Sequence, residues 1–167
     1  GIIRKMKVFF TASQRGKKQF GKNYKLIYDA LVKQGYQVIE DYLLKVDTQD
    51  FYDKMDGGGR DTFVEFYKQE LKYLQDADIN IFECSLHSLS IGFIIQKSLD
   101  FNKPTIVLYQ DEKVPQFLTC IEEEKLMIHS YNLENVEATL KEILDKATNL
   151  REKRFNFFIS PDLLTYL

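Results

Sequence analysis

The stretch ELKYLQDADINIFECSLHSLSIGFIIQKSLDFNKPTIVLY, residues 70–109, contains a complete strand, helix and strand unit. Ile79–Glu83 and Thr105–Tyr109 are short apolar runs, which are typical of buried parallel strands. A polar loop over Ser85–Gly92 and a helix over Phe93–Phe101 connect them, and the proline before the second run stops the helix. Such units join parallel strands by right-handed crossovers, so the stretch predicts an α/β fold.

The same alternation extends toward the N-terminus. Met6–Thr11 predicts a first buried strand, and apolar residues at helical spacing over residues 20–31 predict a helix that ends at Gly35. Tyr36–Tyr42 predicts a second strand. Three consecutive glycines, Gly57–Gly59, then predict a mobile loop. A possible capping box and a helical stripe predict the next helix over Thr62–Gln75.

The C-terminal part continues the pattern. It predicts a helix over Pro115–Glu123, a fifth strand over Lys125–His129 and a closing helix over Val136–Leu150. We therefore expect one domain over residues 1–150. The tail, residues 151–167, combines a basic cluster with apolar runs, and we expect it to pack on the domain or on a second subunit.

Composition narrows the classes of partner. The net charge of −2 provides no basic surface for a nucleic acid, and no apolar run approaches the roughly 20 residues of a membrane span. The two cysteines, Cys84 and Cys120, have no metal-ligand spacing and predict buried thiols in a cytoplasmic protein. We expect no metal and no cofactor.

Polar residues cluster where a parallel sheet binds its ligands, beyond the carboxyl ends of the strands. This geometry selects the loops after the first, third and fourth strands. Two of them are rich in small hydrogen-bond donors. One supplies Thr11, Ala12, Ser13, Gln14, Arg15 and Gly16, and the other supplies Glu83, Ser85, His87, Ser88, Ser90 and Gly92. The second loop leads into a helix, whose N-terminus favours an anion such as phosphate. Ser and Gly there are also common helix caps, and packed or solvated roles for His87 and His129 are commoner than catalytic ones.

Two stretches resemble the nucleoside 2-deoxyribosyltransferase and 2'-deoxynucleoside 5'-phosphate N-hydrolase family. VFFTASQRGK, Val8–Lys17, is similar to the family's first strand and its Arg-Gly turn, and residues 70–109 resemble, without gaps, its block for catalysis and phosphate binding. The resemblance implies a flavodoxin-like (Rossmann-like) three-layer sandwich with a five-stranded parallel sheet. It also implies a homodimer and a small-molecule partner, a nucleoside or nucleoside 5'-monophosphate.

The activity implied by the resemblance is cleavage of the bond between a nucleobase and deoxyribose. One carboxylate attacks the anomeric carbon while a second assists. Glu70 matches the assisting acid, where the family commonly has Asp, but the nucleophile position falls at Ile94, which has no lone pair. Glu83 is the nearest carboxylate in sequence, and it either points at the same pocket or is an ordinary residue at the end of a strand.

The resemblance also assigns ligand contacts. Ser88 matches a phosphate-contacting Ser, Gly92 a close-approach Gly, and Thr119 lies one gap away from a second phosphate-contacting Ser. These positions favour a 5'-phosphorylated ligand. The full set of predicted ligand-binding residues is Thr11, Ser13, Arg15, Gly16, Ser88, Ser90, Gly92 and Thr119.

Three functions stay open at this point. The protein is an N-glycosidase or deoxyribosyltransferase acting through Glu70, a nucleotide-binding or sensor module that has lost the nucleophile, or a structural homologue whose apolar tail mediates oligomerisation. Fold similarity alone does not choose among them.

Restoring a carboxylate at Ile94 tests the assignment of that position. If the pocket is intact, Ile94→Glu should create or greatly raise glycosidic cleavage, measured as released base. In a collapsed apolar site the same carboxylate would be buried without a partner and would destabilise the fold by several kcal/mol. A variant that folds and binds nucleotide yet gains no activity would contradict the placement of Ile94.

Overall fold

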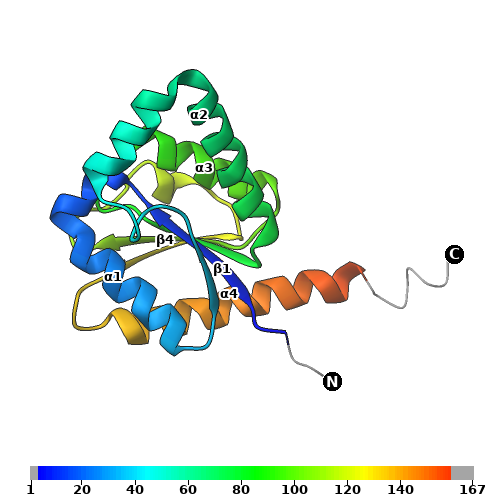
Figure 1. The fold of residues 1–167 in the computed structure, drawn as a ribbon. Helices are drawn as coiled ribbons and strands as arrows, with labels where there is room; N and C mark the ends of the chain where they lie inside the picture. The colour runs from blue at the N-terminus through cyan, green and yellow to red at the C-terminus, as the bar shows by residue number, and fades with distance from the viewer. Residues whose placement is uncertain (1–3, 159–167) are drawn as a thin grey trace, which may run out of the picture.

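Five parallel strands form one sheet in the order β2-β1-β3-β4-β5 (Figure 1). The computed structural model describes the backbone of residues 4–158 and the side chains of residues 4–151. The strands are β1 (Lys7–Ala12), β2 (Gln37–Glu40), β3 (Ile79–Glu83), β4 (Thr105–Gln110) and β5 (Leu126–Tyr131). Every neighbouring pair is parallel, so the predicted α/β fold with a five-stranded parallel sheet is confirmed.

Helices cover both faces of this sheet. The α-helices are α1 (Lys17–Lys33), α2 (Thr48–Asp76), α3 (Leu89–Asp100) and α4 (Val136–Phe158), and two short 3-10 helices are η1 (Gln14–Gly16) and η2 (Leu118–Cys120). Residues of α1 and α4 share one buried cluster with the strands, and residues of α2 and α3 share the other. The molecule is therefore a three-layer sandwich.

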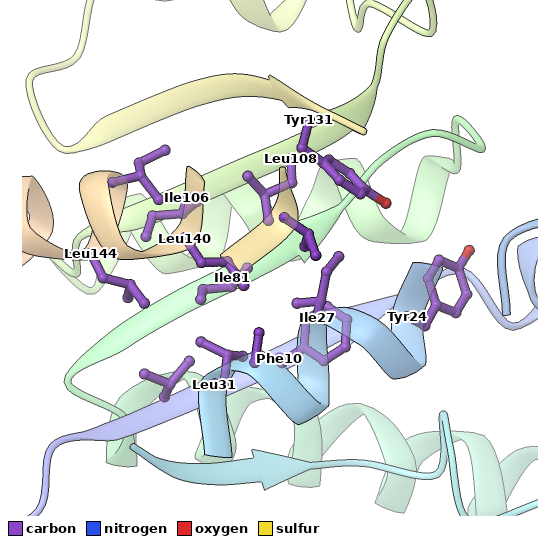
Figure 2. Packing of buried hydrophobic residues seen from close by; sticks show 14 of the residues in the cluster. Phe10, Tyr24, Ile27, Leu31, Ile81, Ile106, Leu108, Tyr131, Leu140 and Leu144 are labelled. Atoms are coloured by element: carbon purple, nitrogen blue, oxygen red, sulfur yellow. The ribbon is translucent and has the colours of Figure 1, made fainter. Parts of the chain in front are cut away.

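Alternation along the strands explains the two clusters. Phe10 and Ile81 point to the face covered by α1 and α4, where Figure 2 shows them among Ile27, Leu31, Leu140 and Leu144. Phe9 and Phe82 point to the opposite face and pack in the cluster that contains residues of α2 and α3. Each such side chain contributes about 1.5–3 kcal/mol by leaving water.

The course of α2 differs from the prediction. The helix begins at Thr48, where the Asp47 carboxylate accepts hydrogen bonds from the backbone N–H groups of Gln49 (2.9 Å) and Asp50 (3.3 Å). The glycines do not form a loop; Gly59 alone leaves the helical region, at φ 64° and ψ −161°, and kinks the helix. The predicted loop is wrong because one glycine at positive φ redirects the chain while the residues on both sides stay helical.

Two other helices also differ from their predicted bounds. α3 begins at Leu89, because the Ser88 side chain caps it and continues the helix back into the predicted polar loop. The helix predicted over Pro115–Glu123 is wrong, since only η2 forms there. Phe117 in this segment is 86% exposed, so the segment contributes little apolar surface that would hold a longer helix against the core.

The C-terminal tail is only partly described. α4 continues through Phe158 instead of ending at Leu150, and Figure 1 shows it running on past the sheet. Residues 159–167 lie outside the described residues, so packing of the tail stays a prediction. None of the helices in residues 4–158 combines the length and hydropathy needed to cross a membrane.

Candidate functional site

A cavity of about 940 Å³ opens at the carboxyl ends of the strands. It lies where the strand order reverses, because the chain leaves β1 toward β2 on one side and β3 pairs with β1 on the other. α2 and α3 form its outer walls. The cavity has one polar end and one aromatic end.

The polar end collects most of the residues predicted from the sequence. The loop after β1 and the loop before α3 contribute Thr11, Ser13, Gln14, Arg15, Ser88 and Ser90, and the predicted catalytic positions Glu70 and Ile94 line the same cavity. His87 also lines it, with its ring 3.4 Å from the carbonyl oxygen of Lys113. Hydroxyl groups and one guanidinium thus face the same space.

Three predicted ligand-binding residues do not line the cavity. Gly16 is buried, and a Cβ there would meet the Tyr24 hydroxyl and Leu86, so its small size serves packing. Gly92 lies within α3 with open space where a Cβ would be. Thr119 lies on η2 and donates its hydroxyl hydrogen to the carbonyl oxygen of Gln116 (2.6 Å).

Ser88, which does line the cavity, caps α3 at the polar end. Its side-chain oxygen accepts a hydrogen bond from the Ile91 N–H at 3.4 Å.

Asp41 and Glu70 form a carboxyl pair at the floor of the cavity. Asp41 follows β2 and accepts hydrogen bonds from the Thr11 hydroxyl (2.7 Å) and the Leu43 N–H (3.0 Å). Glu70, on α2, is 5% exposed and hydrogen-bonds to Asp41. Burial, followed by the negative charge of Asp41, raises the pKa of Glu70 to about 10. Two buried carboxyls in contact do not both ionise, so the pair holds one proton, on Glu70.

One oxygen of Glu70 has no hydrogen-bond partner among the described residues. Glu70 Oε1 is buried and unpaired. A buried polar atom without a partner costs about 1–3 kcal/mol, and at a cavity wall a ligand can supply the missing partner. The free oxygen therefore leaves an unmet hydrogen-bonding capacity at the floor of the cavity.

Asp41 is the main site residue that the sequence analysis missed. It lies at the end of the run YQVIED, at the same edge of the sheet as the two loops rich in donors. An acidic residue at the carboxyl end of a predicted strand was the sequence feature that could have identified it. The ligand site was predicted only in the loops after the first, third and fourth strands, whereas Asp41 lies in the loop after the second. Asp41 directly follows β2, the strand next to β1, and only the fold brings it to Glu70, 29 positions away in sequence.

Ile94 and Glu83 lie in different places. Ile94, 9% exposed, lines the cavity among the apolar residues of α3. Glu83 is 1% exposed on the other face of the sheet, near Tyr24 and Tyr131, and accepts a hydrogen bond from the Ser85 N–H (2.6 Å). Burial raises its pKa to about 7. The idea that Glu83 points at the same pocket is wrong, because it shares the orientation of Ile81 two residues earlier.

The aromatic end of the cavity was not predicted. α2 supplies aromatic side chains from both sides of its kink, and α3 adds another: Phe51, Tyr52, Phe63, Phe66, Tyr67 and Phe93. Phe51 and Phe66 meet edge to face with centroids 5.4 Å apart, which joins the two arms of α2. The density of aromatic residues over 51–67 was the sequence feature that could have predicted it.

No group of three or more His, Cys, Asp or Glu that could hold a metal ion occurs in the described part of the chain.

The Glu70 proton makes stability depend on pH. Because the pKa of Glu70 in the folded protein lies above its ordinary value of 4.5, this group's contribution to stability is fully present below about pH 4.5 and is lost as pH rises toward 10. In the Glu70→Gln variant the side chain stays neutral and can still donate to Asp41. Between about pH 5 and pH 9, the free energy of unfolding of the variant should therefore fall by roughly 1–3 kcal/mol less than that of the unsubstituted protein. Denaturant unfolding at both pH values measures this difference. The exposed Glu65→Gln on the same helix is the control, and equal pH slopes for both variants would refute the buried proton.

Known proteins are similar to this chain in sequence and in fold. No protein-family model matches the chain. The chain is 28% identical to a protein of Thermofilum pendens over 85% of its own length and 90% of the relative's, and 28% identical to one of Methanosarcina mazei over 65% and 63%. Both relatives are named putative 2'-deoxynucleoside 5'-phosphate N-hydrolase 1.

A solved structure supports the same relationship at the level of the fold. The CMP N-glycosidase of Clostridium botulinum superposes with a TM-score of 0.56 at 16% identity, covering 82% of this chain and 98% of that one. The chain is therefore similar in sequence to two proteins that bear the name putative 2'-deoxynucleoside 5'-phosphate N-hydrolase 1, and it shares the α/β fold of the CMP N-glycosidase.

Proposed function

We propose that the protein binds a nucleoside 5'-monophosphate in this cavity and hydrolyses the bond between base and sugar. The names of its relatives, N-hydrolases and an N-glycosidase, indicate this class of substrate and reaction. The observation that carries the proposal is the Asp41–Glu70 pair, one proton on two carboxyls at the floor of the cavity. Cleavage of a glycosidic bond needs both an acid and a carboxylate.

With this pair, hydrolysis needs no nucleophilic side chain at position 94. The bond between the base nitrogen and the anomeric carbon breaks, and protonated Glu70 gives its proton to the leaving base. A water molecule bonds to the anomeric carbon and loses a proton to Asp41, whose charge also stabilises the cationic sugar in the transition state. The proton on Asp41 then returns to Glu70 along their hydrogen bond, which restores the starting state.

The polar end suits the phosphate. The N-terminus of α3 offers backbone N–H groups next to Ser88, and Ser13 and Arg15 line the same end of the cavity. Helix N-termini and guanidinium groups both favour phosphate. With the phosphate at this end, the sugar lies over Asp41 and Glu70, and the base extends toward the aromatic wall.

A second candidate is a nucleotide-binding module without turnover. Ile94 favours it, because an apolar side chain occupies the position that resembles the nucleophile position of the family. This candidate keeps the same ligand and the same cavity. The two candidates therefore differ only in whether base is released.

Released base and binding should be measured together. Nucleoside 5'-monophosphates are incubated with the protein and analysed by chromatography, while calorimetry gives their Kd. We expect the unsubstituted protein to release free base. The rate of release should be about 10²–10⁴-fold lower in the Glu70→Gln variant, whose amide cannot act as the acid that protonates the leaving base. A new nucleotide formed with an added acceptor base would indicate transfer instead of hydrolysis.

The controls separate the two candidates. Glu65→Gln changes an exposed carboxyl on the same helix and should act like the natural chain. Binding without any release would establish the module without turnover. Absence of binding by every nucleotide would overturn the proposal.

We also propose that the protein is a homodimer. Leu89 and Phe117 are 94% and 86% exposed at the same end of the molecule, and a second copy would cover them. Phe117→Lys lies outside the cavity lining and should shift the molar mass, measured by light scattering after size exclusion, from two chains to one. A natural chain that is monomeric at all concentrations would contradict the dimer.

A further inference from the structure

Glu83 lies beneath the two loops that form the polar end of the cavity. In the sheet it pairs with Ala12 of β1, the residue before Ser13, and neighbouring strands lie about 4.8 Å apart. Its Oε1 atom accepts a hydrogen bond from the N–H of Ser85 (2.6 Å), where the loop toward Ser88 begins. The carboxyl of Glu83 is therefore close to the start of both loops, although it lies outside the cavity lining.

Hydrogen bonds tie the first residues of both loops to the body of the domain. The Ser85 hydroxyl accepts a hydrogen bond from the N–H of Gln110, at the end of β4 (2.8 Å). The Tyr24 hydroxyl on α1 donates to the carbonyl oxygen of Ser13 (3.3 Å). Figure 2 shows the hydroxyl groups of Tyr24 and Tyr131 at the same end of the buried cluster. The residues around Glu83 thus form a polar layer under the two loops.

Glu83 is the group of this layer whose charge changes near neutral pH. Burial raises its pKa to about 7. Tyr24 of α1, Tyr131 of β5 and Cys84 of β3 interact with it, and burial raises the pKa of all three, so they stay neutral between about pH 7 and pH 9. Asp111, which follows β4, is exposed and acts on Tyr131.

The charged form of Glu83 is poorly supported by its surroundings. The side chain is buried, and its Oε2 atom has no hydrogen-bond partner among the described residues. The hydrogen bonds that favour the charge come from Ser85 alone. A buried carboxylate in this state is costly, so another negative charge nearby favours its neutral form. A phosphate bound by the two loops supplies such a charge.

We propose that Glu83 is a positioning residue for the phosphate, and that the polar end binds a 5'-phosphate tightly when Glu83 is protonated and weakly when it is ionised. The proposal rests on the proposed function, which places the phosphate at this end. Both forms of the carboxyl accept from the Ser85 N–H, so they differ in the repulsion between carboxylate and phosphate. By linkage, protonation and binding favour each other by the same factor, which we expect to be about fivefold or more.

Binding of a nucleotide that resists cleavage tests the proposal. Carbocyclic 2'-deoxyadenosine 5'-monophosphate lacks the ring oxygen that stabilises the sugar cation, and the same compound without phosphate is its partner. Calorimetry gives both Kd values at about pH 7 and pH 9, where a phosphate monoester, with its second pKa of about 6, is mostly a dianion. The Kd of the nucleotide should rise about threefold or more over this range, and that of the nucleoside by less than about 1.5-fold.

Two variants connect the rise to Glu83. Glu83→Gln removes the titration, and its amide oxygen can still accept from the Ser85 N–H. In this variant the Kd of the nucleotide should change by less than about 1.5-fold between the two pH values. Asp111→Asn removes an exposed carboxylate beside the same layer, and Asn tolerates the positive φ of 41° there, so this variant should keep the rise. Thermal melting checks that both variants are folded.

A second measurement needs no substitution. Calorimetry at about pH 7.5 in two buffers with different enthalpies of ionisation counts the protons that accompany binding. Because a bound phosphate raises the pKa of Glu83 further, the unsubstituted protein should take up roughly 0.3 proton or more per nucleotide. The uptake should be lost in Glu83→Gln and kept in Asp111→Asn.

The outcomes distinguish this proposal from the proposed function. A nucleotide that binds equally at both pH values, without proton uptake, would overturn the role of Glu83 and leave the proposed function standing. A rise that persists in Glu83→Gln, or that the nucleoside shows equally, would also overturn that role. A nucleoside too weak to measure would support it, since the phosphate then carries the binding. Failure of the nucleotide to bind at either pH would overturn both.

Discussion

The pairing of β1 with β3 is the constraint from which the rest of the structure follows. The two strands align over five residue pairs, from Val8 with Ile79 to Ala12 with Glu83, and their side chains are buried on both faces. β2 adds to the far side of β1 and β4 to the far side of β3, so the chain reverses its direction of travel between these two strands. The crevice at their carboxyl ends is the consequence, and the cavity occupies it.

The proposed chemistry depends on the burial of two carboxyls in this crevice. Asp41 is held by Thr11 and by the backbone of Leu43, so its charge has hydrogen-bond donors. Glu70 has no such donors and one unpaired oxygen, so it keeps its proton. Two residues of the same chemical type thereby take opposite protonation states, which provides an acid and a carboxylate at one point.

The aromatic wall depends on the kink in α2. A straight helix of this length would carry Phe51 and Phe66 away from each other, 15 positions apart in sequence. The positive φ of Gly59 folds the helix back, so both arms present rings to the same space. Gly59 thus shapes the pocket, whereas the run of three glycines in the sequence indicated only mobility.

The amino-acid sequence by itself determined the order of strands and helices, the parallel sheet and the loops that carry the site. The strands and helices follow from local periodicity and turn residues, because an apolar run such as Ile79–Glu83 predicts a buried strand without knowledge of the rest of the chain. The resemblance placed Glu70, Ile94 and Ser88 at what proves to be one cavity. Helix ends were less predictable, as α3 and the segment after β4 show, since caps and packing shift them by several residues.

Only the tertiary structure decided which carboxyls meet. Glu83 ends β3 and Asp41 follows β2 at the same edge of the sheet, and the pleat sends Glu83 to the face of α1 and α4 while Asp41 turns to Glu70. The raised pKa of Glu70 depends first on burial and then on the negative charge of Asp41, which is distant in sequence. Neither quantity is local in sequence, because burial and charge interaction depend on distances in space that the fold alone sets.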